Sequence, residues 1–273
     1  MTEANARFQG SIPELYDRHL GPVIFEPYAE DLARRVIADA PQPVLELACG
    51  TGILTAQLRA RLAPSSRVVA TDLNQAMIDY AQAKLGGTEQ IDWQTADAAN
   101  LPFPPNSFSA VACQFGLMFV PDKEAPFREA QRVLVDNGMF AFNVWDAFEH
   151  NPFGRLAHET IRGFFPTDPP NFYEVPFGFH DVDALRRLLA DNGFGYVQLE
   201  RLTLEARSPT ARSFAIGLVK GNPVCLAIQE RGGALEPIVD ALAAALVRIG
   251  GDHPFRSTMQ AIVVTARARE VPD

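Results

Sequence analysis

Residues 44–52 read VLELACGTG, a short apolar run that leads directly into two closely spaced glycines. A run of this length is typical of a buried strand, and residues 53–62 continue with the apolar spacing of a helix. A second apolar run, residues 67–71, is followed by an acid, Asp72, which lies 20 positions after Gly52. In a strand-turn-helix-strand unit of this spacing, glycines let the backbone approach a ligand and the acid holds a ribose. The stretch therefore predicts a nucleotide-binding unit.

Three kinds of ligand suit such a unit, and the residues discriminate between them. A dinucleotide unit has a third glycine where this chain has Thr55. A phosphate-binding loop carries Lys and then Ser or Thr after its last glycine, whereas Ile53 and Leu54 stand there. A nucleoside without phosphates agrees with the lack of basic residues in residues 44–57, and the Glu46 carboxylate suits a cationic amino group. We prefer the nucleoside and keep an NAD-dependent oxidoreductase as the alternative.

These segments resemble the class I S-adenosylmethionine (SAM)-dependent methyltransferases, and within them the ubiquinone/menaquinone-type group. The resemblance rests on the glycine motif of residues 46–52, on Asp72 and on residues 95–103 (TADAANLPF), and it extends over about residues 16–145. It implies a doubly wound, mostly parallel seven-stranded α/β sheet, with SAM as cofactor and S-adenosylhomocysteine as product. A protein of this fold that binds SAM without transferring its methyl group is a further alternative.

The resemblance also implies which residues bind the cofactor. Asp72 holds the ribose, Asp97 accepts a hydrogen bond from the adenine amino group, and Tyr16, in an N-terminal Tyr-Asp pair, reaches the cofactor. Tyr16 can equally pack within a lid, and Leu73 and Met77 can equally belong to the core. The predicted set is Tyr16, Glu46, Ala48, Gly50, Gly52, Asp72, Leu73, Met77, Asp97, Ala98 and Gln114.

Asp72 has a competing role as the cap of the next helix, predicted over residues 74–85. Asn74 is a good N-cap residue, so we expect it to cap that helix and to leave the Asp72 carboxylate for a ribose.

Methyl transfer from a sulfonium needs mainly alignment of donor and acceptor. A general base is needed only when the attacked atom carries a proton, and His150, just after a predicted strand, is the candidate catalytic residue. A lone histidine is nevertheless more often structural. Several phenylalanines favour a small apolar or aromatic acceptor, attacked at O, N or C, although core packing explains them equally well: Phe115, Phe119, Phe148, Phe153, Phe164 and Phe165.

The composition of the chain limits the kinds of binding partner that we expect. A net charge of −9 without a cluster of basic residues disfavours a nucleic-acid groove. Residues 1–10 lack an apolar leader core and no run is long enough to span a membrane, so we expect a cytoplasmic protein. Cys49, Cys113 and Cys225 are far apart, which predicts buried reduced thiols and no metal site. The expected partner is a small-molecule substrate. The sequence does not determine the oligomeric state, and a homodimer is one possibility.

Beyond residue 145 the alternation of strands and helices breaks, which divides the chain. Residues 121–135 are predicted as a helix, with Asn137 and Gly138 as the turn into a strand of residues 139–145. The predicted division is a helical lid (1–40), a SAM-binding core (41–146), a substrate segment (147–180), a closing part of the core (181–207 and 252–273) and a helical cap (208–251).

Overall fold

The computed structural model describes residues 8, 10–39 and 43–268 of the chain. These residues form two compact units. The sheet unit comprises Tyr28–Val144, His180–Arg201 and Ile262–Asp273, and the helical unit comprises Met1–Pro27, Trp145–Phe179 and Leu202–Ala261. The predicted lid-core boundary at residues 40 and 41 lies outside the described residues, as does most of the polar segment 1–10. The finer division into lid, core, substrate segment and cap stays a prediction.

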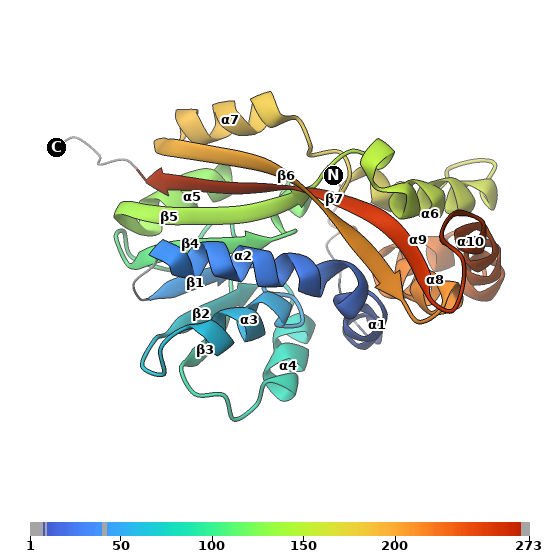
Figure 1. The fold of residues 1–273 in the computed structure, drawn as a ribbon, viewed down its shortest axis with the longest axis horizontal. Helices are drawn as coiled ribbons and strands as arrows, with labels where there is room; N and C mark the ends of the chain where they lie inside the picture. Colours follow the sequence, from blue (N-terminus) through green and yellow to red (C-terminus); the bar gives the residue numbers. More distant parts are fainter. Residues whose placement is uncertain (1–7, 9, 40–42, 269–273) are drawn as a thin grey trace. The chain divides into compact units, whose positions relative to one another are not determined.

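One sheet contains seven strands in the order β3-β2-β1-β4-β5-β7-β6. The strands are β1 (Val44–Leu47), β2 (Val68–Asp72), β3 (Ile91–Thr95), β4 (Phe108–Gln114), β5 (Leu134–Trp145), β6 (Phe194–Ser208) and β7 (Phe255–Ala268). Strands β1 to β5 pair in parallel, whereas β6 and β7 run in opposite directions (Figure 1). The predicted doubly wound, mostly parallel seven-stranded α/β sheet is confirmed.

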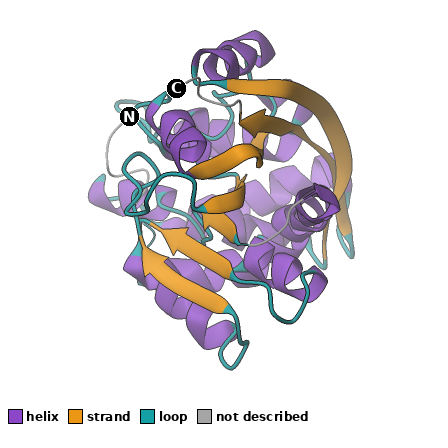
Figure 2. Ribbon diagram, turned by 90° about the vertical axis from the view of Figure 1, so that its left-hand side faces the viewer, coloured by secondary structure: helices purple, strands orange, loops and turns teal. Residues whose placement is uncertain are grey.

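Helices cover both sides of the strands in the sheet unit (Figure 2). They are α2 (Glu26–Asp39), α3 (Ile53–Arg61), α4 (Gln75–Lys84), α5 (Ala125–Val133) and α7 (Val182–Asp191), with a 3₁₀ turn η3 (Leu117–Phe119). A parallel strand covered on both faces needs apolar residues at successive positions. This explains why β1, an inner strand between β2 and β4, is buried along its whole length although it contains Glu46.

The helix predicted over residues 121–135 is wrong at both ends, because α5 spans only Ala125–Val133. Leu134 already pairs with Phe108 of β4, and regular pairing resumes with Met139 opposite Ala110. The residues between form a bulge in β5, where Asn137 has a positive φ of 59°. Asn-Gly has the same left-handed preference in a turn and in a bulge, so the pair alone does not distinguish them.

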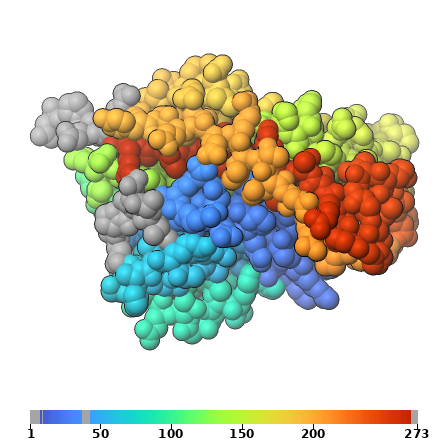
Figure 3. Space-filling view, viewed as in Figure 1, coloured from blue at the N-terminus to red at the C-terminus, as the bar shows by residue number. Residues whose placement is uncertain are grey.

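The helical unit is built from short helices and from parts of β6 and β7. Its elements are α1 (Ile12–His19), a π-helical turn η2 (Gly21–Phe25), η4 (Phe148–His150), α6 (Pro152–Gly163), η5 (Phe172–Glu174), α8 (Ala211–Lys220), α9 (Val224–Glu230) and α10 (Leu235–Gly250). Helix α10 packs against α8 and α6, and its outer face is visible in Figure 3 among the red atoms at the right. The helical content predicted for residues 208–251 is confirmed by α8, α9 and α10. Among the described residues, no helix combines the length and apolar content that crossing a bilayer requires.

A buried amide fastens β7 to the segment that follows β5. The side chain of Asn151 is completely buried. Its Nδ2 lies 3.0 Å from the Asp146 and Gln260 carbonyl oxygens and 3.2 Å from that of Ala147, and its Oδ1 accepts from the Gln260 amide at 3.0 Å. The sequence Asn151-Pro152-Phe153 therefore serves the structure of the helical unit.

We expect Asn151→Ala to lower the free energy of unfolding by about 2–4 kcal/mol, because the Gln260 amide loses its acceptor and the carbonyls of Asp146, Ala147 and Gln260 each lose a donor. Chemical denaturation measures this loss. Asn171→Ala is the matched control, since Asn171 is exposed. An equal effect of both substitutions would contradict the role given to Asn151.

Candidate functional site

The loop after β1 has an unusual backbone. Ala48, Gly50 and Gly52 have positive φ values of 52°, 54° and 77°, a conformation that a residue with a side chain rarely adopts. The Cys49 amide donates to the Thr71 carbonyl at 2.8 Å, and the Gly52 amide donates to the Cys49 carbonyl at 2.9 Å. Helix α3 starts directly after this turn, with Gly52 at its N-cap and no capping side chain. Its first amide groups are thus available to an anionic group of a ligand.

The two glycines of this loop differ in what surrounds them. A Cβ on Gly50 would meet no atom within 4 Å, so the chain leaves open space beside this residue. A Cβ on Gly52 would lie 3.0 Å from Leu85 Cδ1 and 3.2 Å from Ala81 Cβ. Gly52 therefore allows α4 to approach, and Gly50 leaves room for a ligand.

Asp72 ends β2 and is 7% exposed. Its Oδ2 accepts a hydrogen bond from the Gly50 amide at 2.9 Å, and its Oδ1 accepts one from the Asn74 amide at 2.8 Å. Burial raises the pKa of this carboxyl, and the amides of Asn74 and Gly50 oppose the rise. Oδ2 has a second lone pair that can accept from a ligand hydroxyl.

The expected capping role of Asn74 is wrong. Asn74 occupies the N-cap position of α4, yet its side chain makes no capping hydrogen bond. Its Nδ2 instead lies 3.3 Å from Asp72 Oδ1, as a donor toward the carboxylate. Asn74 thus supports the position of Asp72.

Glu46 is a buried acid in the middle of β1, 1% exposed. Its Oε2 accepts no hydrogen bond from any residue that the structure describes. Burial raises the pKa of Glu46 to about 8; the Thr55 hydroxyl opposes this rise and the charge of Asp72 adds to it. An unpartnered buried carboxyl is costly unless a group outside the chain completes it, and a cationic amino group would do so.

The loop after β4 lies against the loop after β1. A Cβ on Gly116 would be 2.4 Å from Ala48 Cβ and 2.8 Å from Cys113 Sγ, so only glycine fits there. Phe115 has a positive φ of 52°, and its amide donates to the backbone oxygen and to Oδ1 of Asn143, both at 3.1 Å. Sequence reasoning missed Gly116 and Asn143; the signal for Asn143 was a single polar residue within the otherwise apolar residues 139–145.

Lys123, which sequence reasoning also missed, closes the other end of this loop. Its Nζ donates to the carbonyls of Met118 at 2.6 Å, Val120 at 2.8 Å and Leu117 at 3.3 Å. Gln114, the predicted site residue at the end of β4, is half-buried.

The remaining predicted residues of the sheet unit lie after β2 and β3. Leu73 is 57% exposed, an unusual exposure for a leucine beside a buried acid, whereas Met77 is 3% exposed and packs in the core. Asp97 is exposed and Ala98 half-buried. Asp97 Oδ1 accepts from the Ala99 amide at 2.8 Å. The structure thus brings together Glu46, Gly50 and Asp72, and places Leu73 beside them in the chain.

Comparisons with known proteins assign the family. A methyltransferase domain family matches residues 44–138. The demethylmenaquinone methyltransferase of Lactobacillus johnsonii is 31% identical over 175 residues, which cover 59% of this chain and 71% of that protein. The chain belongs to the class I SAM-dependent methyltransferases, in the ubiquinone/menaquinone-type group.

Other relatives agree. The ubiquinone/menaquinone biosynthesis C-methyltransferase of Escherichia coli is 29% identical over 178 residues, covering 59% of this chain and 70% of that protein. The structure of Haemonchus contortus phosphoethanolamine N-methyltransferase 2 with S-adenosylhomocysteine shares the fold, with a TM-score of 0.62 at 14% identity over 98% of this chain and 60% of that chain. The enzyme is therefore a methyltransferase with SAM as cofactor, and the family match does not support the oxidoreductase alternative.

The residues of the glycine loop fit this cofactor. The open space beside Gly50 gives a backbone cradle that a Cβ would fill. The unpartnered Oε2 of Glu46 suits the ammonium group of SAM. Because SAM carries no phosphate, this carboxyl would not repel it. In the part of the chain that the structure describes, no three His, Cys, Asp or Glu side chains are grouped to hold a metal ion.

Two predicted residues belong to the helical unit. The Tyr16 ring stacks on Phe25, with centroids 4.7 Å apart, and meets Phe8 edge-on at 5.9 Å. His150 ends the short turn η4, and its side chain is exposed. Packing within the helical unit accounts for the position of Tyr16. The cofactor contact of Tyr16 and the catalytic role of His150 stay predictions.

We expect Gly116→Ala to weaken binding of S-adenosylhomocysteine and to lower stability by about 1–3 kcal/mol, because the added methyl displaces Ala48 in the glycine loop. Calorimetric titration and thermal unfolding measure the two effects. Gly163→Ala is the control, since a Cβ there meets no atom within 4 Å. Wild-type affinity in a folded Gly116→Ala protein would show that the two loops are independent.

Glu46 also makes a prediction about pH. Binding a cationic ammonium favours the ionised carboxylate, so affinity for S-adenosylhomocysteine should rise by up to about tenfold per pH unit between pH 6 and 8. Without ligand, a pKa raised from 4.5 to about 8 makes stability fall as the pH rises through this interval. Glu46→Gln should remove both slopes. Identical pH profiles of affinity in the two proteins would exclude Glu46 from the ligand site.

Proposed function

We propose that the sheet unit binds SAM along the carboxyl edge of its parallel strands and that the acceptor of the methyl group is a small aromatic molecule. The observation that carries the binding proposal is the buried Asp72 carboxylate hydrogen-bonded to the Gly50 amide. A ribose that donates its hydroxyls to this carboxylate lies beside the open space at Gly50. Open α/β sheets bind their ligands at this edge.

The other parts of the cofactor are assigned by charge. The ammonium group faces Glu46, and the carboxylate of the methionine moiety meets the first amide groups of α3 and the loop at Ala48 and Gly52. Leu73 covers the purine, with Met77 behind it. Asp97 accepts from the adenine amino group through its Oδ2, which accepts no hydrogen bond from the described residues, while Ala98 and Gln114 flank the nucleoside.

The reaction follows from the sulfonium. When bound, SAM supplies an electrophilic methyl group whose bond to sulfur breaks as the bond to the acceptor forms, leaving a neutral thioether. The chain contributes alignment and exclusion of water. A phenol or quinol acceptor also loses a proton, and His150 is the proposed base that takes it.

The proposal of an aromatic acceptor is supported by the relatives that the chain resembles, which act on menaquinone and ubiquinone precursors by name. The phenylalanines add little. Phe115 and Phe153 are only 5% and 1% exposed, and Phe153 packs with Trp145 and Phe214 in the helical unit. Their number reflects the core as much as a pocket.

Localisation and assembly also remain proposals. We propose a cytoplasmic enzyme with a small-molecule substrate and without a nucleic-acid partner, which agrees with the net charge of −9. A homodimer is one assembly to test by light scattering.

The proposed function is tested by calorimetric titration with S-adenosylhomocysteine and with NAD as control, followed by incubation with methyl-labelled SAM and reduced naphthoquinones, benzoquinones, phenols or amines. We expect tight binding of S-adenosylhomocysteine alone and label in a quinol-type product. Binding without label in any product would favour a SAM-binding protein that does not transfer methyl. Label in an amine would overturn the aromatic acceptor.

Asp72→Ala should weaken the binding of S-adenosylhomocysteine by about 2 kcal/mol or more, roughly 30-fold in affinity. The substitution removes charge-assisted hydrogen bonds to the ribose and leaves the Gly50 amide without its acceptor. The control is Asp79→Ala, which removes the same charge from the exposed face of α4. Unchanged affinity in the Asp72 variant would remove this residue from the site.

A further inference from the structure

In the loop between β3 and β4 (residues 96–107, the β3–β4 loop), the Asn100 amide donates to the Asp97 carbonyl, and the segment after Asn100 has little backbone hydrogen bonding of its own. Three of its residues, Pro102, Pro104 and Pro105, have no amide hydrogen to donate. The carbonyls of Pro104 and Pro105 accept from the Ser107 hydroxyl at 2.8 and 3.5 Å. At the end of the loop, the amides of Asn106 and Ser107 donate to the carbonyls of Arg132 and Val133 at 3.1 and 2.8 Å. The contacts of Leu101 and Phe103 come from outside the loop.

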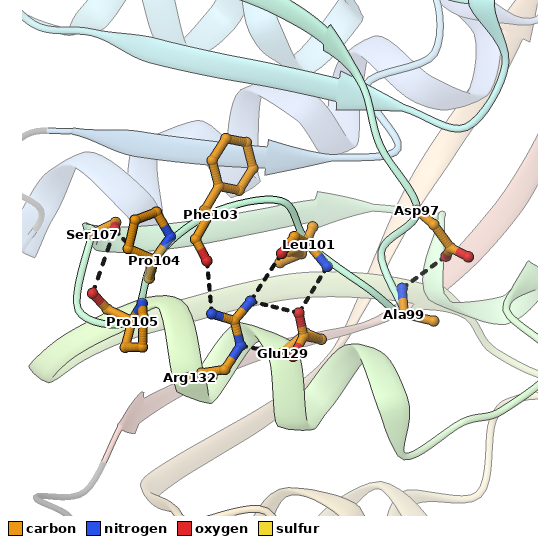
Figure 4. Close-up of polar contacts among 9 residues, drawn as sticks. All are labelled: Asp97, Ala99, Leu101, Phe103, Pro104, Pro105, Ser107, Glu129 and Arg132. Carbon is orange, nitrogen blue, oxygen red and sulfur yellow. Dashed lines mark hydrogen bonds and ion pairs between the residues drawn. The ribbon is translucent and has the colours of Figure 1, made fainter.

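Helix α5 supplies these contacts through two side chains one turn apart (Figure 4). Arg132 donates through Nη1 to the Phe103 carbonyl at 2.7 Å and through Nη2 to the Leu101 carbonyl at 3.0 Å. Glu129 Oε2 accepts from the Leu101 amide at 2.7 Å. The Glu129–Arg132 ion pair thus binds three backbone groups of the loop: the amide and carbonyl of Leu101 and the carbonyl of Phe103.

The pair is itself tightly organised. Arg132 Nε donates to Glu129 Oε1 at 2.8 Å, and Nη2 donates to Oε2 at 2.7 Å. Their side chains are 32% and 13% exposed, so water screens the pair only partly. A planar guanidinium can make these contacts in a fixed geometry, whereas an ammonium group can occupy only one point among them.

These contacts reach the residue assigned to adenine. The Asn100 amide donates to the Asp97 carbonyl at 3.0 Å, and the Ala99 amide donates to Asp97 Oδ1 at 2.8 Å, which together form one tight turn. Leu101, held by Glu129 and Arg132, follows this turn directly, and its side chain is 4% exposed. The turn is therefore anchored at its end by α5.

We propose that Glu129 and Arg132 are positioning residues that fix Asp97 and Ala98 for recognition of the adenine ring edge. This inference rests on the proposed function, because it assumes that the β3–β4 loop reads adenine. The pair touches no cofactor atom and acts only through the loop. Its effect is specificity for the amino group of adenine.

The test compares S-adenosylhomocysteine with S-inosylhomocysteine, in which an oxo group replaces the adenine amino group and the ring edge loses its hydrogen-bond pattern. Calorimetry gives the ratio of the two affinities for each protein. We expect the wild type to prefer S-adenosylhomocysteine by about tenfold or more, as for one hydrogen bond to a charged group. In Arg132→Met the preference for S-adenosylhomocysteine should fall by about fivefold or more, because the turn that carries the Asp97 carboxylate is no longer held in place.

The matched control is Arg128→Met, which removes the same charge from an exposed position of α5 and should keep the wild-type ratio. Arg132→Lys and Glu129→Gln carry the test if Arg132→Met fails to fold. We expect Arg132→Lys to reduce the preference as well, because lysine keeps the charge but lacks the planar guanidinium that reaches two carbonyls. Glu129→Gln retains an acceptor for the Leu101 amide and should give an affinity ratio between those of the wild type and Arg132→Met.

A folded Arg132 variant that keeps the wild-type preference overturns the inference and leaves the proposed function intact. An equal loss of both affinities also overturns it, since this shows a structural role without specificity. If the wild type binds S-adenosylhomocysteine without preferring it over the inosyl compound, the loop does not read adenine and the inference fails. If the wild type binds neither ligand, the proposed function fails first.

Discussion

The hydrogen bond between the Gly50 amide and the Asp72 carboxylate links the ends of two neighbouring parallel strands. A sheet ladder positions the strands but not the loops beyond them, so the carboxyl edge of β1 and β2 needs a separate bond. Asp72 provides it in two directions, since its other oxygen holds the turn into α4 through the Asn74 amide. The cost of burying this carboxylate is offset by the amides it accepts from. The open space at Gly50 exists because this bond keeps the glycine loop in its left-handed course.

The loops after β1 and β4, at the same carboxyl edge of the sheet, both contain strained backbone. Ala48 and Phe115 both have positive φ, a conformation that costs energy for residues with side chains. Such a backbone persists only where its surroundings determine it. Asn143 accepts from the Phe115 amide with two oxygens, and Gly116 lets the two loops touch. The adjacent strands therefore share one rigid edge, and a ligand held by one loop is held by both.

The sequence was sufficient for the parts of the fold that depend on local pattern. Apolar runs located β1 and β2, and the spacing from Gly52 to Asp72 placed the acid at the strand end, because both follow from the local pattern of the chain. The bulge at Asn137, the failure of Asn74 to cap α4 and the bonds of Asn143 could not be predicted in this way. Each depends on a partner distant in sequence: Phe108 pairs with Leu134, and Asn143 receives the amide of Phe115, 28 residues earlier. Of the candidate site, its glycines and acids carried a signal, whereas Gly116, Lys123 and Arg132 carried none.

The basic residues of these loops explain how an acidic edge is maintained. Lysine and arginine have only donors, so they are the natural partners of carbonyls that a loop leaves without amides. Lys123 donates to the carbonyls of residues that follow β4, and Arg132 donates to those of the β3–β4 loop that precedes β4. Asp72, together with Glu46 when a cationic group ionises it, sets the local charge. A phosphate would be repelled there, whereas a cofactor that carries an ammonium and a sulfonium is attracted.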